Sequence, residues 1–264
     1  MNIAALVPIK TNSRRLPNKN FLQLSGQPMC RHIFNALGEV NNIDIFCYTS
    51  NPSVMSVLPN YVRYLPRLPK FDLDTVTAQE LFTSAIKKLH NYDDILITHA
   101  TSPLIKPQSI REAINIYHSK ENYDSVVACR KYKKYAWFRN STLNYNLEKS
   151  KQTNDIDPII IETSGFYIFK KDYYLKTARR IGNNPFFYEV TYEESIDIDT
   201  LEDFKEASLI FASSNYNNKN LDLDLNLAPE TYGIFNLESP IKLVVFDLDD
   251  TAAIADFIHS ELAL

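Results

Sequence analysis

Glycine is scarce in this sequence, with 5 in 264 residues, where an average chain of this length carries roughly 18. The five stand far apart, at Gly26, Gly38, Gly165, Gly182 and Gly233. Neither the GxGxxG fingerprint of dinucleotide-binding folds nor the GxxxxGKS/T loop of P-loop nucleotidases can be assembled from them. Any phosphate that this chain holds must therefore be held by something other than a glycine-rich loop.

Cysteine is scarce too, since Cys30, Cys47 and Cys129 are odd in number and far apart. This fits reduced core residues better than a disulfide framework or a zinc site. No apolar run approaches the ~18 residues of a membrane span, and the short apolar run at the N-terminus lacks the basic region of a signal peptide. The net charge of -4 gives no support to nucleic-acid or polybasic membrane-surface binding. We therefore expect a cytoplasmic protein without nucleic-acid or membrane partners.

Short apolar runs alternate with longer segments of helical spacing along the first four fifths of the chain. Alternating units with fully apolar strands predict an α/β fold, in which a mostly parallel sheet is covered by helices on both faces. Strands are expected at 3–9, 43–49, 62–65, 94–99, 124–129 and 159–169, and helices at 28–40, 75–89, 110–117 and 201–211.

Two segments interrupt this alternation. Residues 131–157 are polar and rich in Tyr and Asn, and they carry the one tryptophan, Trp137; they are interpreted as a small β flap or a dimer contact. Residues 213–220 have the composition of a linker. The apolar and acidic residues that alternate over 221–227 favour an extended segment with one solvated face over a calcium site.

The first candidate site is the loop from Lys10 to Asn20, directly after the first expected strand. In doubly wound sheets ligands bind beyond the carboxyl ends of the strands, which is where this loop would lie. Four cations within ten residues, interleaved with Asn and Ser donors, suit a triphosphate, because Arg can fork onto phosphate oxygens and Lys acts as a mobile point charge. The competing interpretation is a solvated basic turn before a helix.

The second candidate site contains Asp197 and Asp199. Separated by one residue, the two carboxylates project to the same face of an extended backbone. Two oxygen ligands completed by waters and substrate phosphates match the preference of Mg²⁺. Thr200 is expected to cap the following helix, with Asp203 as its box-like partner. The alternative is that both Asp residues only decorate a helix entry.

Between these segments, His99, Thr101 and Ser102 close an expected core strand. A strand end of this composition can offer an imidazole and two hydroxyls to a ligand. A lone histidine is more often structural or solvated, so for His99 that alternative remains open.

Four motifs in this order resemble the acylneuraminate cytidylyltransferases, the CMP-sialic acid synthetase family, over residues 1–212. They are Leu16-Pro-Asn-Lys-Asn20, Thr101-Ser-Pro-Leu104, Ser164-Gly-Phe-Tyr-Ile-Phe169 and Asp197-Ile-Asp-Thr-x-x-Asp-Phe204. The resemblance implies a Rossmann-like α/β nucleotidyltransferase domain that is dimeric through a protruding flap. It also implies the transfer of CMP from CTP to a nonulosonic acid, with release of pyrophosphate.

The resemblance also implies roles for individual residues. Asp197 and Asp199 are expected to hold Mg²⁺, and Arg14 and Lys19 to stabilise the departing pyrophosphate. The residues that the resemblance places around CTP or in its pocket are Lys10, Asn12, Ser13, Arg14, Lys19, Arg67, Thr101 and Ser102. His99 is added to this set from its place at the strand end.

This sequence departs from the family pattern at three places. The loop that usually begins Arg-Gly-Gly-Ser-Lys is Lys10-Thr-Asn-Ser-Arg14, the usual Gln-Pro-Thr-Ser-Pro-Leu-Arg is His99-Ala-Thr-Ser-Pro-Leu-Ile105, and the usual Asn-Gly is Ser164-Gly165. The residues for nucleotidyl transfer are kept better than those expected to touch the base or the acceptor. The acceptor could therefore be another acid, such as a phosphonate or a 3-deoxy sugar acid, and a non-catalytic nucleotide-binding assembly module is the alternative from another class.

A further motif lies near the end of the sequence, where Lys242-Leu-Val-Val-Phe-Asp-Leu-Asp-Asp-Thr251 resembles the first motif of haloacid dehalogenase-type phosphatases. The resemblance makes Asp247 the nucleophile and Asp249 the acid/base. Few residues follow Thr251, too few for the remaining motifs of such a site. The expected organisation is a cytidylyltransferase domain at 1–212 with its flap at about 131–158, a linker at 213–240 and a truncated, inactive segment at 241–264.

Overall fold

The computed structural model describes residues 2–11, 13–119, 121–217, 234–236 and 242–244. The chain divides into two compact units, Met1–Asn215 and Tyr216–Leu264. In the second unit, strands β12 (Ile234–Asn236) and β13 (Lys242–Val244) pair antiparallel. The 221–227 segment and the phosphatase-like residues Asp247 and Asp249 lie outside the described residues.

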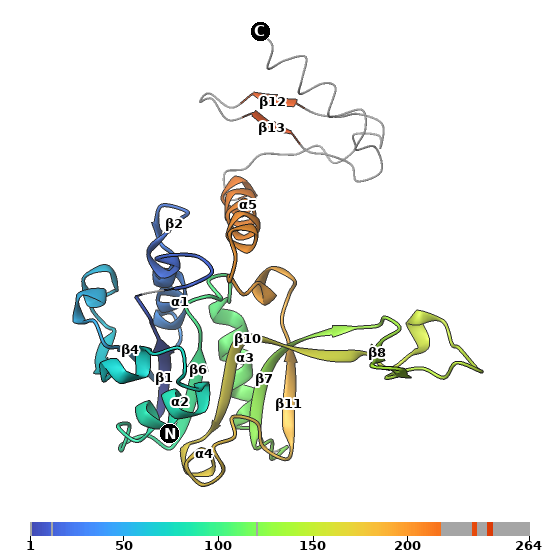
Figure 1. The fold of residues 1–264 in the computed structure, drawn as a ribbon, viewed down its shortest axis with the longest axis horizontal. Helices are drawn as coiled ribbons and strands as arrows, with labels where there is room; N and C mark the ends of the chain where they lie inside the picture. The colour runs from blue at the N-terminus through green and yellow to red at the C-terminus, as the bar shows by residue number, and fades with distance from the viewer. Residues whose placement is uncertain (1, 12, 120, 218–233, 237–241, 245–264) are drawn as a thin grey trace. The chain divides into compact units, whose positions relative to one another are not determined.

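The first unit is built on a seven-stranded sheet with the order β11-β7-β10-β6-β1-β4-β5 (Figure 1). Neighbouring strands run parallel except β10, which is antiparallel to both β6 and β7. The prediction of a mostly parallel sheet is thereby confirmed. The strands are β1 (Ile3–Pro8), β4 (Ile43–Thr49), β5 (Arg63–Pro66), β6 (Asp94–Thr98), β7 (Ser125–Tyr132), β10 (Ile159–Lys170) and β11 (Pro185–Glu189).

Helices cover both faces of this sheet, as predicted. Successive residues of β1 enter different cores: Ala5 and Val7 pack with α1 and α3, whereas Ala4 and Leu6 pack with α2 and α4. A strand buried on both faces has no polar alternation, which is why β1 is an uninterrupted apolar run. The helices are α1 (Met29–Gly38), α2 (Ala78–Ile86), α3 (Pro107–Tyr117), α4 (Lys171–Thr177) and α5 (Leu201–Asn217).

Shorter elements fill the connections. The 3-10 helices are η1 (Lys19–Phe21), η2 (Pro52–Val57), η3 (Pro69–Asp72), η4 (Thr153–Asp155) and η5 (Glu193–Ser195), and the short strands are β2 (Gln23–Leu24), β3 (Gln27–Pro28), β8 (Trp137–Phe138) and β9 (Ser141–Thr142). None of the helices in the described part of the chain has the length and apolar character that a bilayer crossing requires.

The flap is present where it was predicted. β7 and β10 pair as far as Tyr132 and Ile159, and the segment between them, which includes the β8–β9 pair, projects from the sheet (Figure 1). Trp137 and Phe138 are exposed on it. Because β10 returns from the flap beside β7, the strand that entered it, β10 runs antiparallel. Its first residues pair with the end of β7, and Phe166 lies opposite Thr98 at the carboxyl end of β6.

Some predicted boundaries were wrong. The helix expected from residue 75 begins at Ala78, because Thr77 and Glu80 form a capping box there. Helix α5 continues to Asn217, so the first residues of the expected linker are helical. Helix α4 and the half-buried edge strand β11 were not predicted from the sequence.

Candidate active site

The two candidate sites predicted from the sequence are the loop after β1 and the segment that carries Asp197 and Asp199. They lie together at the carboxyl ends of β1 and β6. The segment that carries the aspartates is anchored beside β6 by Ile198, whose N–H donates to the Thr101 carbonyl at 2.8 Å. Ile198 itself is fully buried, so its packing in the core fixes the backbone from which Asp197 and Asp199 project on either side. This edge of the sheet is where ligands bind in doubly wound folds.

Asp199 is held by two cations from the loop after β1. Lys19 Nζ lies 2.8 Å from its Oδ1, and Arg15 Nη2 lies 2.7 Å from its Oδ2. Lys19 also donates to the Ile198 carbonyl at 2.8 Å. The side chain of Lys19 is 12% exposed and that of Arg15 is 67% exposed, so Lys19 is the cation built into the site and Arg15 reaches it from solvent.

Asp197 is half-buried, and its Oδ1 is buried without a hydrogen-bond partner within the described part of the chain. Burial raises the pKa of this carboxyl; the charge of Asp199 acts in the same direction, while the Thr101 and Ser164 hydroxyls and the charge of Lys19 oppose it. A buried carboxylate oxygen without a donor is costly unless a cation satisfies it.

These two carboxylates fit a divalent cation. No group of three or more His, Cys, Asp or Glu side chains suited to a metal occurs among the described residues, so the protein would supply only Asp197 and Asp199. Mg²⁺ is commonly bound in this way, through one or two carboxylates plus waters and substrate phosphates. The unpaired Oδ1 of Asp197 is the observation on which this fit rests.

The predicted cap at the start of α5 is confirmed. Asp203 Oδ2 accepts from the N–H groups of Asp199 at 2.9 Å and Thr200 at 2.7 Å, and Thr200 Oγ1 accepts from the N–H of Asp203 at 3.2 Å. This box satisfies the N–H of Asp203, one of the free donors in the first turn of the helix. It also fixes the backbone of Asp199, and therefore the direction from which its carboxylate leaves the chain.

The other two cations of the loop after β1 contact the segment that follows β5. Lys10 Nζ donates to the Asp72 carbonyl at 3.2 Å, and Arg14 Nη2 lies 2.6 Å from Asp74 Oδ2 with 81% of its side chain exposed. Asn20, which the sequence reasoning did not single out, donates to the Lys10 carbonyl at 2.8 Å and fixes the loop's entry. Asn12 lies outside the described residues.

Arg67 lies in the wall of the site. Its side chain has no exposed surface, and its guanidinium donates to the Ile9 carbonyl at 2.7 Å and the Tyr48 carbonyl at 3.1 Å. It also pairs with Asp72 at 2.6 Å. In this structure Arg67 ties the carboxyl ends of β1 and β4 to the loop that Lys10 contacts, so its role is to position that loop.

The strand end at His99 contributes further unpaired polar atoms. His99 Nε2 and Ser102 Oγ are buried without partners among the described residues. Burial lowers the pKa of His99 to about 4, with the positive charges of Arg180 and Lys19 acting in the same direction and Asp199 opposing them. The imidazole is therefore neutral at physiological pH, and it packs edge-on against Phe82 at 6.0 Å between ring centroids.

This lowered pKa predicts a pH-dependent loss of stability. The folded pKa of about 4 lies below the ordinary histidine value of 6.5, so as the pH falls the unfolded chain takes up the proton first. The contribution of the neutral His99 imidazole to the free energy of unfolding is complete above pH 6.5. It falls by about 2 to 3 kcal/mol toward pH 4. Denaturant unfolding of metal-free protein at pH 7 and pH 4.5 measures it. The His99→Gln variant is expected to lose less, and equal losses in both proteins would contradict the assignment.

Two arginines near the site were missed. Arg180 stacks over the Tyr167 ring at 4.1 Å and contributes positive charge at His99. Arg130, at the end of the core run of β7, lines a pocket of about 170 Å³ together with Asp197 and Ser164. The sequence signal for Arg130 is a charged residue at the end of an apolar strand. Charged residues are common at the ends of strands that have no functional role, so this signal does not single out Arg130.

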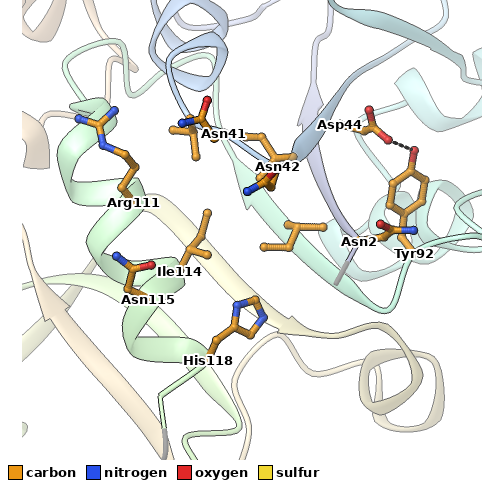
Figure 2. Close-up of a pocket in the computed structure, with 12 residues that line it drawn as sticks. Asn2, Asn41, Asn42, Asp44, Tyr92, Arg111, Ile114, Asn115 and His118 are labelled. Carbon is orange, nitrogen blue, oxygen red and sulfur yellow. Dashed lines mark hydrogen bonds between the residues drawn. The ribbon is translucent and has the colours of Figure 1, made fainter.

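A larger hollow of about 700 Å³ lies at the opposite, amino ends of β1 and β4 (Figure 2). Its ionisable groups already have partners: Tyr92 donates to Asp44 at 2.6 Å, His118 is 3.2 Å from Asp94, and Arg111 donates to the Glu39 carbonyl at 3.1 Å. Size alone does not make it a site, and the chemistry lies at the other edge of the sheet.

Comparisons with known proteins agree with this placement. The family model described as "Cytidylyltransferase" matches residues 4–221. The CMP-N,N'-diacetyllegionaminic acid synthase of Legionella pneumophila is 31% identical, over 76% of this chain and 92% of that protein. The N-acylneuraminate cytidylyltransferase of Streptococcus agalactiae is 26% identical, over 77% of this chain and 52% of that protein. The chain thus spans about half the length of the Streptococcus agalactiae relatives.

Solved structures support the fold. A CMP:2-keto-3-deoxy-manno-octonic acid synthetase complexed with CTP superposes with a TM-score of 0.57 at 13% identity, covering 81% of this chain and all of that one. The 4-diphosphocytidyl-2C-methyl-D-erythritol synthase of Anaerococcus prevotii gives 0.58 at 12% identity, covering 80% and 96%. With the family model matching most of the sequence, this chain belongs to the cytidylyltransferase family.

Proposed function

We propose that this protein transfers CMP from CTP to a hydroxyl of a nonulosonic, sialic-type sugar acid and releases pyrophosphate. The observation that carries the proposal is the meeting of Asp197 and Asp199 with Lys19 at the carboxyl edge of the sheet, in a chain of the cytidylyltransferase family. Relatives named for acylneuraminate and diacetyllegionaminic acid support the acceptor class.

Mg²⁺ is part of the proposal. Asp197 and Asp199 would hold it, and when bound it supplies positive charge that orients the triphosphate and offsets the charge developing during transfer. The unpaired Oδ1 of Asp197 supports this assignment. Binding of Mg²⁺ by Asp199 would replace at least the contact between Asp199 and the exposed Arg15.

The chain's own residues perform the remaining tasks. Lys19 and Arg14 lie on the loop after β1 and would neutralise the departing pyrophosphate, since fixed cations aimed at developing charge stabilise such transition states. Thr101 and Ser102 offer hydroxyl groups at the end of β6, and Ser102 Oγ is unpaired. Arg67 acts indirectly by holding the strands that carry the loop.

The flap and the cellular location complete the proposal. The exposed Trp137 and Phe138 on the flap suit a contact with a second copy of the chain, and we propose a homodimer that functions in the cytoplasm. Exposed apolar side chains gathered on a projecting segment commonly mark such contacts.

The test is pyrophosphate release from CTP by the purified chain with Mg²⁺ and a panel of acids. N-acetylneuraminic acid, N,N'-diacetyllegionaminic acid, 3-deoxy-manno-octulosonic acid and a phosphonate form the panel, because His99 and Ile105 replace the family's usual Gln and Arg. Formation of a CMP-sugar that depends on both CTP and Mg²⁺ supports the proposal. Tight CTP binding without turnover on any acid would favour a non-catalytic nucleotide-binding module.

A further inference from the structure

A small pocket adjoins the aspartate site on the side of the flap. It has a volume of about 170 Å³, and Asp197, Ser164 and Arg130 line it. Asp197 belongs both to this pocket and to the proposed cation site. A molecule seated here would therefore lie directly beside the atoms at which CMP transfer takes place.

Arg130 is held in this pocket with part of its hydrogen-bonding capacity unused. Its Nη1 donates to the Val190 carbonyl at 2.9 Å, and its guanidinium lies 5.7 Å from the centroid of the Tyr132 ring. Its Nε is buried without a partner, and within the described part of the chain it forms no salt bridge at 4 Å or less. A half-buried guanidinium without a carboxylate partner is uncommon, because burying an unpaired charge is costly.

The other charged side chains that line this pocket are two carboxylates, Asp197, which belongs to the proposed cation site, and Glu162. Glu162 Oε2 accepts a hydrogen bond from the Tyr167 hydroxyl at 2.7 Å, and it forms no salt bridge with Arg130. Arg130 is therefore the cation of the pocket. Arginine binds carboxylates through parallel N–H donors, which gives both strength and orientation.

We propose that Arg130 binds the carboxylate of the acceptor sugar acid. This inference rests on the proposed function, since it concerns the acceptor of that reaction. In a nonulosonic acid the carboxyl carbon is bonded to the anomeric carbon, whose hydroxyl attacks the α-phosphorus of CTP. The carboxylate must consequently lie within a few bonds of the reacting oxygen, and Arg130 is the pocket cation placed beside Asp197. By fixing the carboxylate, Arg130 selects acids over neutral sugars and orients the attacking hydroxyl.

The test compares Arg130→Met with the matched control Lys131→Met. Lys131 is the next residue of β7, and it pairs with Glu189 at 3.9 Å instead of lining the pocket. Loss of a charge-assisted contact predicts a ~10- to 100-fold rise in KM for the acid in Arg130→Met. The KM of Arg130→Met for CTP is expected to stay within about twofold of the wild-type value. In Lys131→Met the KM for the acid and the KM for CTP are both expected to stay within about twofold. Arg130→Lys is expected to recover part of the loss.

A second substrate separates recognition of the carboxylate from a structural effect. The wild type is expected to discriminate strongly between N-acetylneuraminic acid and its methyl ester, and Arg130→Met is expected to lose most of this discrimination. Equal losses toward the acid and the ester, or a parallel rise in KM for CTP, would overturn the inference.

Calorimetric titration of the same acids into the chain tests the inference independently of turnover. Binding to the wild type that is lost in Arg130→Met supports the role of Arg130 even where no acid is converted, a result that would count against the proposed function alone. Unchanged binding in the variant, or no binding of any of these acids to the wild type, would overturn the role of Arg130.

Discussion

Replacement of Asp197 by asparagine is expected to lower the rate of pyrophosphate release from CTP by about 10²–10³ fold, the usual cost of removing one electrostatic stabiliser from an active site. Asn keeps the shape of the side chain but removes the charge of the unpaired, buried Oδ1. The reaction would be followed by steady-state kinetics at saturating CTP. Mn²⁺ titration monitored by electron paramagnetic resonance is expected to show a parallel loss of affinity.

The stability of this variant distinguishes a functional loss from misfolding. Burial raises the pKa of Asp197, so the folded protein binds this proton more tightly than the unfolded chain does. Above that pKa the ionised carboxylate costs folding free energy. Metal-free Asp197→Asn is therefore expected to be at least as stable as the wild type at pH 7, by thermal unfolding.

The exposed Glu202, in the first turn of α5, provides the matched control. Glu202→Gln also removes one carboxylate near the site, and its activity is expected to stay within about twofold. Near-normal turnover in Asp197→Asn would refute the assigned cation site. A loss of unfolding free energy in Asp197→Asn large enough to account for its lower rate would instead indicate a structural role for Asp197.

The sheet could largely be predicted because its strands are buried on both faces. Such strands are short uninterrupted apolar runs, and Ile43–Thr49 has the bounds that the pattern indicated. The antiparallel direction of β10 could not be predicted, because apolar content is the same in either direction. Edge strand β11 was missed since its residues are only partly buried, and the core pattern is weak there.

The geometry of the candidate site was predictable where chemistry and spacing coincide in one segment. Asp197 and Asp199 stand one residue apart, and the cap at Thr200 follows directly. The role of Arg67 was not predictable, because its partners are main-chain carbonyls of residues far away in the sequence. The same holds for the place of Arg130 in its pocket, which residues of β7 and β10 form together with Ser195 and Asp197.

The two cations that hold Asp199 are expected to differ greatly in their contribution. Lys19→Met is expected to lower kcat/KM for CTP by about 10²-fold, because its ammonium is nearly enclosed and joins Asp199 to the Ile198 carbonyl. Arg15→Met removes a contact of the same length and is expected to lower kcat/KM by less than about fivefold, since an exposed pair is screened by water and salt. Steady-state kinetics at varied CTP concentration measures both.

Salt and stability provide the decisive controls for this pair. Raising the ionic strength is expected to reduce the small effect of Arg15→Met further and to leave that of Lys19→Met nearly unchanged, because screening acts mainly on exposed charges. Lys19→Met is also expected to lose about 1–3 kcal/mol of unfolding free energy, since the Ile198 carbonyl and Asp199 Oδ1 both lose this donor. Equal kinetic effects of the two variants would mean that charge alone matters at Asp199. The predicted inequality would mean that enclosure, which is not visible in the basic loop as a sequence, decides which of its cations acts on the phosphates.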